Sequence, residues 1–317
     1  MADLIAIISV LALLVALLVD RYLGEPAASL HPVVWMGNYL NWAAGQIKPK
    51  PSPAVRDLRS FWLAAVYWWA GVAMVLIVAC AVQWAAFLLP WYVAAPLLGL
   101  ALKPLLAWAM LSSEVQAVEV ALGESLEAGR QRLAMLVSRD TTNLSESEVR
   151  ESAIESLAEN LNDSVVAPIF WFVLLGLPGA ALYRFANTAD AMWGYRGLRN
   201  GVNWEWAGKW AAWADDVLSW LPARLTALLL ALVVGGINFK SLRLEARKTP
   251  SPNSGWPMAA MALALGVSLQ KPGVYVLNAA GRPPKAPDTA LAQKYGSNTL
   301  MAQVIIASIA IVLIAAI

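Results

Sequence analysis

The sequence predicts an all-α, polytopic integral membrane protein with re-entrant or broken helices and a cytoplasmic helical insert. Hydrophobic residues make up 59% and charged residues 14% of the 317 residues, whereas soluble domains are roughly 45–50% apolar and about 25% charged. Several apolar runs reach the roughly 20 residues that cross a bilayer as a helix. Two further apolar runs contain Pro or Gly in their interiors, where these residues break or kink a helix.

The first three apolar runs predict three crossings. The N-terminal run, "LIAIISVLALLVALLV", has no basic segment before it and is too long for the apolar core of a signal peptide, so we expect a retained span. Runs over about 61–84 and about 90–111 follow, with an uncharged turn between them. The positive-inside rule places residues 20–60 in the cytoplasm and the N-terminus outside. The basic residues behind this assignment are Arg21, Lys48, Lys50, Arg56 and Arg59.

The rest of the chain fits one membrane domain that covers residues 1–317. Residues 112–163 are expected to form a cytoplasmic helical insert within it, and the run over 300–317 a short last span. Two Pro-rich stretches, 48–53 and 281–288, are typical of surface loops.

Two interrupted runs in the middle leave the topology open. The run over 165–185 contains Gly-Leu-Pro-Gly at 176–179. It either crosses or forms two half-helices that return to the same side, which is tolerated where irregular backbone is buried in protein. The run over 217–239 contains Pro222 and likewise either crosses the membrane or is re-entrant. If both runs cross, residues 184–216 lie outside, and if both are re-entrant, these residues lie in the cytoplasm.

An acidic segment stands out in this apolar chain. Residues 138–163 carry seven acidic and two basic side chains. Ser145 and Glu148 fit a capping box, so a helix is expected to begin near Glu146. Four carboxylates recur at every fourth position and therefore share one face of this helix. They are Glu151, Glu155, Glu159 and Asp163.

The acidic face allows two interpretations. Glu151 and Glu155 fit a solvated face as well as they fit a functional site. For Glu159, Asn160 and Asp163, beside the membrane entry, a site is favoured, because polar groups at a bilayer boundary tend to be functional. The expected ligand is Mg²⁺ or an amine.

A second polar group lies in "YRFANTADAMWGYR" (183–196). Asn187 and Asp190 fall on one helix face, with Arg184 a turn before them. Oxygen ligands beside guanidinium groups suit a metal-bound phosphate. The alternative is a polar cluster that only holds helices together.

Three weaker signals complete the candidates. Asp215 and Asp216 are adjacent, so at most one is expected to face a site directly. Ser251 and Asn253 lie in a Pro-flanked turn that could form an anion nest. His31, the only histidine, precedes a proline and is more often structural than catalytic in such a position.

Several function classes are excluded. There is no G-x-x-x-x-G-K-[ST] phosphate loop, no dinucleotide-binding glycine motif and no zinc-ligand spacing. A single histidine rules out a multi-histidine metal centre. The net charge of +2 and the scattered basic residues argue against a nucleic-acid partner.

Six motifs in order resemble one known family. The stretches "GEP…HPVVWMG", "SRDTTNL", "ESLAENLNDSVVAP", "YRFANTADAMWGYR", "DDVLSWLPARL" and "PSPNSGWPMAAMALALGV" are similar to those of the CobD/CbiB family, adenosylcobinamide-phosphate synthase. The resemblance covers about Asp20 to Val267. Departures occur at Trp213 and in "SLQKPGVYVLNAAG" (268–281), where the family is usually glycine-rich, and this leaves the choice of amine open.

The resemblance implies ATP-dependent amide formation in cobalamin biosynthesis. A propionate of adenosylcobyric acid, a corrinoid, would be joined to (R)-1-amino-2-propanol or its O-phosphate, with ATP and Mg²⁺ as cofactors. It also implies a multi-pass protein of the bacterial inner membrane whose active site faces the cytoplasm. Association with other cobalamin-assembly membrane enzymes is plausible.

We assign roles on this hypothesis from residue chemistry. Acids would hold Mg²⁺ or receive the proton of the amine, and arginines would meet phosphate charge. If segments 138–163, 184–196 and 248–257 form one site, the run over 165–183 should be re-entrant, because ATP is cytoplasmic. The catalytic candidates are Glu159, Asp163, Asp190 and Asp216, of which the first three would also bind the metal; Arg139, Arg184, Arg224, Asn187, Ser251 and Asn253 would bind ATP; His31, Asn160, Tyr195 and Asp215 would contact substrate.

The competing reading is a non-catalytic membrane protein, either a transporter or a sensor-like relative such as AmpE. A transporter would place ionisable groups at mid-membrane depth within inverted repeats. Here the acids cluster outside the long apolar runs and no repeat is visible. The sequence therefore favours the enzyme.

Overall fold

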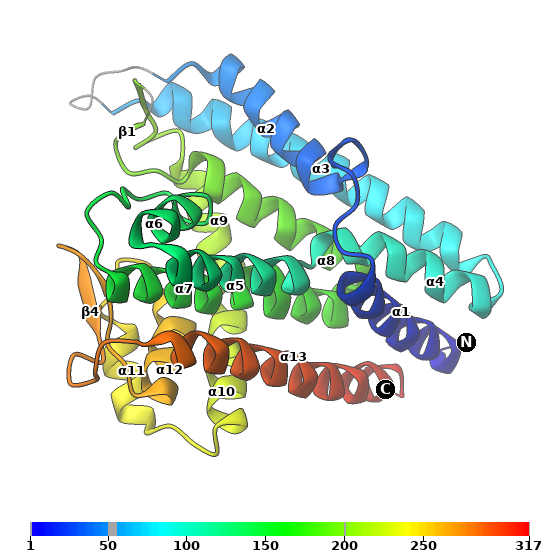
Figure 1. Ribbon diagram of the computed structural model, residues 1–317. Helices are drawn as coiled ribbons and strands as arrows, with labels where there is room; N and C mark the ends of the chain where they lie inside the picture. Colours follow the sequence, from blue (N-terminus) through cyan, green and yellow to red (C-terminus); the bar gives the residue numbers. More distant parts are fainter. Residues whose placement is uncertain (1, 50–55, 200, 317) are drawn as a thin grey trace. The chain divides into compact units, whose positions relative to one another are not determined.

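The computed structural model describes residues 2–49, 56–199 and 201–316 (Figure 1). Most of the Pro-rich stretch predicted over 48–53 lies outside the described residues. The expected all-α fold is confirmed, with the addition of two short two-stranded hairpins. The chain forms two compact units, each assembled from separate stretches of sequence.

Unit 1 contains residues 1–106, 167–219 and 307–317. In it α1 packs on α4, and α2 and α3 both pack on α8. Its elements are α1 (Ala2–Tyr22), η1 (Ala28–Leu30), α2 (Pro32–Ile47), α3 (Leu58–Phe87), α4 (Trp91–Leu102), η2 (Lys103–Leu105), α8 (Ala167–Trp193), β1 (Leu198–Arg199), β2 (Val202–Asn203) and α9 (Lys209–Leu218).

Unit 2 contains residues 107–166 and 220–306, so the whole predicted insert, 112–163, lies in it. Helix α7 packs on α5, α6 and α12, and α12 also packs on α10 and α11. Its elements are α5 (Trp108–Glu124), α6 (Leu126–Ala134), α7 (Glu146–Leu161), a π-helical turn η3 (Asn162–Val166), α10 (Trp220–Val233), α11 (Phe239–Ala246), α12 (Gly255–Leu265), β3 (Leu269–Lys271), β4 (Tyr275–Leu277) and most of α13 (Ala286–Ala315).

The long apolar runs form the expected membrane helices. Within the described ranges, five helical runs are long and apolar enough to cross a membrane, or six if α9 and α10 count together. The helices expected over the N-terminal run and 61–84 are confirmed as α1 and α3. The span expected over 90–111 lies within the candidate span Trp91–Glu124, in which α4 ends at Leu102 and α5 begins at Trp108. Pro104, which cannot donate the next helical hydrogen bond, stands in the gap.

Helix α8 is broken where the sequence predicts it. Gly176 has φ 68°, a conformation that favours glycine, and the freed N–H of Leu177 donates to Gln83 Oε1 at 2.7 Å. A side-chain carbon added at Gly179 would collide with the carbonyl oxygen of Trp171. In a straight helix these two residues would lie about 12 Å apart along the axis, because each of the eight steps rises 1.5 Å. The chain therefore turns back at Gly176 as two half-helices, which supports the re-entrant alternative.

Candidate functional site

The acidic helix begins as its sequence predicts. Ser145 and Glu148 form the capping box of α7, in which the Ser145 N–H donates to Glu148 Oε2 at 2.7 Å. One apolar stripe of α7 is fully covered. Its members are Val149, Ala153, Leu157 and Leu161, each exposed by 1% or less.

The solvated-face interpretation of Glu151 and Glu155 is wrong. Their exposed fractions are 2% and 1%, because α7 is covered by neighbours on nearly every side. Arg139, in the loop before α7, donates from Nη2 to Glu155 Oε2 at 2.9 Å and from Nη1 to Ser152 Oγ at 3.1 Å. The acidic segment therefore carries its own basic partner.

A second source of polar groups is the β3–β4 hairpin, which packs on α7. The backbone N–H of Gln270 donates to Glu151, and Lys271 and Tyr275 interact electrostatically with the α7 carboxylates. Neither Lys271 nor Tyr275 was predicted from the sequence as a site residue. Their signal was two short apolar runs around Pro272-Gly273, typical of a hairpin, inside the stretch that departs from the family pattern.

Burial gives this cluster unusual proton affinity. These groups precede the apolar stretch that begins at Val165. Burial, and then the charge of Glu155, raises the pKa of Glu151 to about 7. Burial also raises the pKa of Glu155, against the opposing effect of Arg139, and burial followed by Glu155 raises the pKa of Tyr275. Among these three groups, Glu151 can therefore take up or release a proton near neutral pH.

One carboxylate oxygen of the cluster has spare acceptor capacity. Glu151 Oε2 is buried and has no hydrogen-bond partner among the described residues, whereas Glu155 is bonded by Arg139 and Tyr275. A buried polar atom without a partner is costly. A cationic or N–H-bearing ligand would satisfy Glu151 Oε2.

The C-terminal end of α7 brings Glu159 and Asp163 together. Both are partly exposed, lie one turn apart and interact electrostatically. Asp163 belongs to η3, and π-helical turns of this kind are frequent at functional sites. Asn162 fixes this turn, since its Nδ2 donates to Asp163 Oδ1 at 2.7 Å and its Oδ1 accepts from Thr226 Oγ1 at 3.0 Å. Asn160 donates to the Ser156 carbonyl at 3.0 Å.

In the predicted anion nest of the 248–257 loop, backbone N–H groups already donate to a side chain of the same loop. Ser251 Oγ accepts the N–H groups of Asn253 and Ser254, each at 3.2 Å, so neither is a free donor. Arg224 Nη1 donates to Asn253 Oδ1 at 2.7 Å, and its guanidinium lies over the Trp220 and Trp256 rings at 4.5 and 5.0 Å. The structure thus brings Arg224, Ser251 and Asn253 together.

The second polar group of the sequence lies in unit 1. Asn187 Nδ2 donates to Asp215 Oδ1 at 3.3 Å, which joins α8 to α9. A side chain at Gly194 would collide with the carboxylate of Asp190, so this glycine makes room for Asp190. Asp216 interacts with Arg196, so the two adjacent aspartates have different partners.

Two further candidates of unit 1 lie near this group in sequence. Arg184, on α8, is partly exposed, and its carbonyl accepts from Thr188 Oγ1 at 2.7 Å. Tyr195 donates to the Ala191 carbonyl at 2.9 Å, and its ring lies under Arg199 at 3.5 Å. Its substrate contact remains a prediction.

His31 has a structural role, as its position before proline favours. Its Nδ1 accepts the N–H of Val33 and caps α2, and its Nε2 lies 3.1 Å from Glu25 Oε2. Glu25 also contacts the buried Lys103 at 2.6 Å, and Lys103 contacts Asp20 at 3.2 Å. A buried ion network therefore ties α1, the segment before α2, and η2 together. Substrate contact by His31 stays a prediction.

The metal prediction divides between the two units, because Glu159 and Asp163 belong to unit 2 and Asp190 to unit 1. In the part of the chain that the structure describes, no three His, Cys, Asp or Glu side chains are grouped as a preformed metal site. Magnesium usually takes only one or two carboxylates, with water and substrate phosphates completing its shell. A pair such as Glu159 and Asp163 fits that mode.

The comparisons agree with the motifs. Residues 13–301 match the family model described as CobD/Cbib protein. The chain is 42% identical to a probable cobalamin biosynthesis protein CobD of Methanothermobacter thermautotrophicus, over 84% of this chain and 85% of the relative. It is 41% identical to the cobalamin biosynthesis protein CobD of Chromobacterium violaceum, over 82% and 81%. No solved structure matches the chain significantly. The chain therefore belongs to the CobD/CbiB family, and its role lies in cobalamin biosynthesis.

Proposed function

We propose that the protein forms the amide bond between a propionate of adenosylcobyric acid and (R)-1-amino-2-propanol or its O-phosphate, at the expense of ATP. The product would be adenosylcobinamide or its phosphate. Family membership supports the pathway, and the buried acidic face of α7 supports this type of reaction.

One observation carries the proposal: Glu151 is buried with an unsatisfied carboxylate oxygen, next to the buried ion pair of Glu155 and Arg139. An amino alcohol arrives as an ammonium ion and must lose a proton before its nitrogen can attack an acyl carbon. A buried carboxylate with a pKa near neutrality can bind the ammonium ion and accept that proton. Arg139 balances the charge that remains.

The described residues also fit Mg-ATP. Glu159 and Asp163 offer oxygen ligands at a partly exposed edge, which is what a phosphate-bound Mg²⁺ requires. When bound, ATP would activate the propionate, a poor acyl donor, by phosphoryl transfer. Arg184, Asn187 and Asp190 of unit 1 remain candidates for nucleotide or metal binding by their residue chemistry, and Arg224 of unit 2 remains a candidate for phosphate binding.

The location is part of the proposal. A cytoplasmic membrane with the site facing the cytoplasm suits the need for ATP, and the turn of α8 at Gly176 supports a re-entrant segment. Contacts with other cobalamin-assembly enzymes in that membrane are proposed from the shared pathway alone.

The direct test is an amide-forming assay in detergent with adenosylcobyric acid, Mg-ATP and either amine, followed by mass spectrometry of the corrinoid. The wild type is expected to form product, and Glu159→Gln and Asp163→Asn are expected to lower the rate by roughly 10²–10⁴-fold. The matched control is Glu127→Gln, an exposed carboxylate on α6, which should retain full activity.

The assay separates the enzyme from the non-catalytic alternative. A monodisperse wild type that binds the corrinoid but forms no product with either amine would contradict the proposal and favour a sensor or carrier. The amine that is consumed identifies the substrate.

A further inference from the structure

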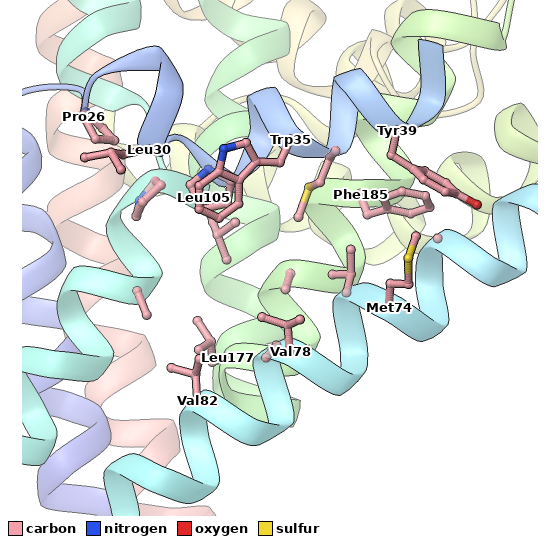
Figure 2. A pocket seen from close by; sticks show the side chains of 18 of the residues that line it. Pro26, Leu30, Trp35, Tyr39, Met74, Val78, Val82, Leu105, Leu177 and Phe185 are labelled. Carbon is pink, nitrogen blue, oxygen red and sulfur yellow. The ribbon is translucent and has the colours of Figure 1, made fainter. Parts of the chain in front are cut away.

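Unit 1 contains an apolar cavity of about 500 Å³ that is open to the exterior, since lining residues such as Trp35 and Val78 are exposed by 53% and 62%. Figure 2 shows Met74, Val78 and Val82 of α3 on one wall, with Trp35 and Tyr39 of α2 and Phe185 of α8 opposite them. All of the lining residues belong to unit 1.

Ordered water is not a favourable occupant of this cavity. A buried water needs two to four polar partners, and the lining side chains are almost entirely apolar. Because the cavity is open to the exterior, an apolar molecule from the surroundings can enter it and supply dispersion contacts to its lining side chains.

The shape and depth of the cavity indicate the occupant. Its lining follows α3 from Gly71 to Val82, about 16 Å of helix axis at 1.5 Å per residue. Helix α3 is long and apolar enough to cross a membrane, so the long axis of the cavity runs along a membrane helix. Along its membrane-spanning part, α3 is surrounded by the hydrocarbon chains of the bilayer.

One end of the cavity lies beside charged groups. Pro26 and Pro104 line the cavity, and their chain neighbours Glu25 and Lys103 form the ion pair described above. The cavity thus leads from a polar boundary into apolar depth, the same gradient that a phospholipid presents from headgroup to chain.

We propose that this cavity binds one acyl chain of a bilayer phospholipid. The chain would lie between α2, α3 and α8 and replace the missing packing of these helices. This proposal does not rest on the proposed function, because it concerns only unit 1 and its lipid.

The test is photolabelling of the full-length protein in phosphatidylethanolamine vesicles that contain a phospholipid with a diazirine in its acyl chain. Met36 lines the cavity and is only 7% exposed, so label on it reports an acyl chain inserted in the cavity and not lipid that lies on the outer surface. Label is expected on Met36 in the wild type. Ala79→Phe, which places a ring in the cavity, is expected to lose most of this label.

The matched control is Ile77→Phe, on the exposed face of α3 and outside the cavity, which should keep the Met36 label. Val82→Phe serves as the filling variant if Ala79→Phe is not monodisperse. Label confined to outward-facing side chains of the wild type, or undiminished Met36 label in a folded filling variant, would overturn the proposal. Neither result depends on amide-forming activity.

Discussion

Lys103→Met is expected to lower the free energy of unfolding by about 3–5 kcal/mol, the cost of leaving a buried ionic group without its partner. Lys103 and Asp20 are each 2% exposed, and Lys103 also contacts Glu25 at 2.6 Å. Removal of the ammonium group would leave two carboxylates together in an apolar surrounding. The loss should appear as a lower unfolding midpoint in detergent.

Two variants make this prediction specific. Lys240→Met, at an exposed lysine of α11, should leave the midpoint unchanged. Lys103→Met combined with Asp20→Asn and Glu25→Gln should recover part of the loss, because neutral groups cost less to bury than charges. If Lys103→Met were as stable as the wild type, the ion network would contribute nothing to unit 1.

Glu151→Gln is expected to lower the rate of amide formation by roughly 10²–10⁴-fold, the usual contribution of a positioned acid or base. Because the pKa of Glu151 is about 7, its carboxylate form increases as pH rises through 7. The wild-type rate should therefore rise through this pH and level off above it. The glutamine variant, which cannot accept the proton, should lack that rise. Rates are measured from pH 5.5 to 8.5 with Glu127→Gln as the control.

The same residue has a stability signature that does not depend on activity. The pKa of Glu151 is raised from an ordinary value of 4.5 to about 7, so the folded state holds a proton that the unfolded state releases between these values. The contribution of Glu151 to stability is therefore complete below about pH 4.5 and is lost as pH rises to about 7. Glu151→Gln should flatten this part of the pH dependence. An unchanged rate profile and an unchanged stability profile would together remove Glu151 from the site.

The local features of the chain were readable from its sequence because they depend on neighbours in sequence. The capping box of Ser145 and Glu148 fixed the start of α7 by hydrogen bonds within one helical turn. The break in α8 followed from Gly176 and Pro178, which act on their own turn of helix. The break in the run over 90–111 is local as well, because Pro104 acts on its own turn of helix. What the sequence did not show is that Lys103 is buried there against Asp20 and Glu25, which are far away in sequence.

For the candidate site, the sequence predicted the helix face of the carboxylates but not their burial. The spacing of Glu151 and Glu155 placed them on one face of a helix, but their burial depends on what packs against that face. The β3–β4 hairpin that brings Lys271 and Tyr275 to α7 is more than 100 residues further along the chain. The three-membered metal group of Glu159, Asp163 and Asp190 remains a prediction.

The sequence by itself determined that this is a helical membrane protein of the CobD/CbiB family with an acidic helix beginning at Glu146, because composition, run length and ordered motifs are properties of the chain alone. Only the tertiary structure decided that the acidic face is buried and that a cavity lies along α3. Both are properties of packing, since exposure depends on elements that are distant in sequence and adjacent in space.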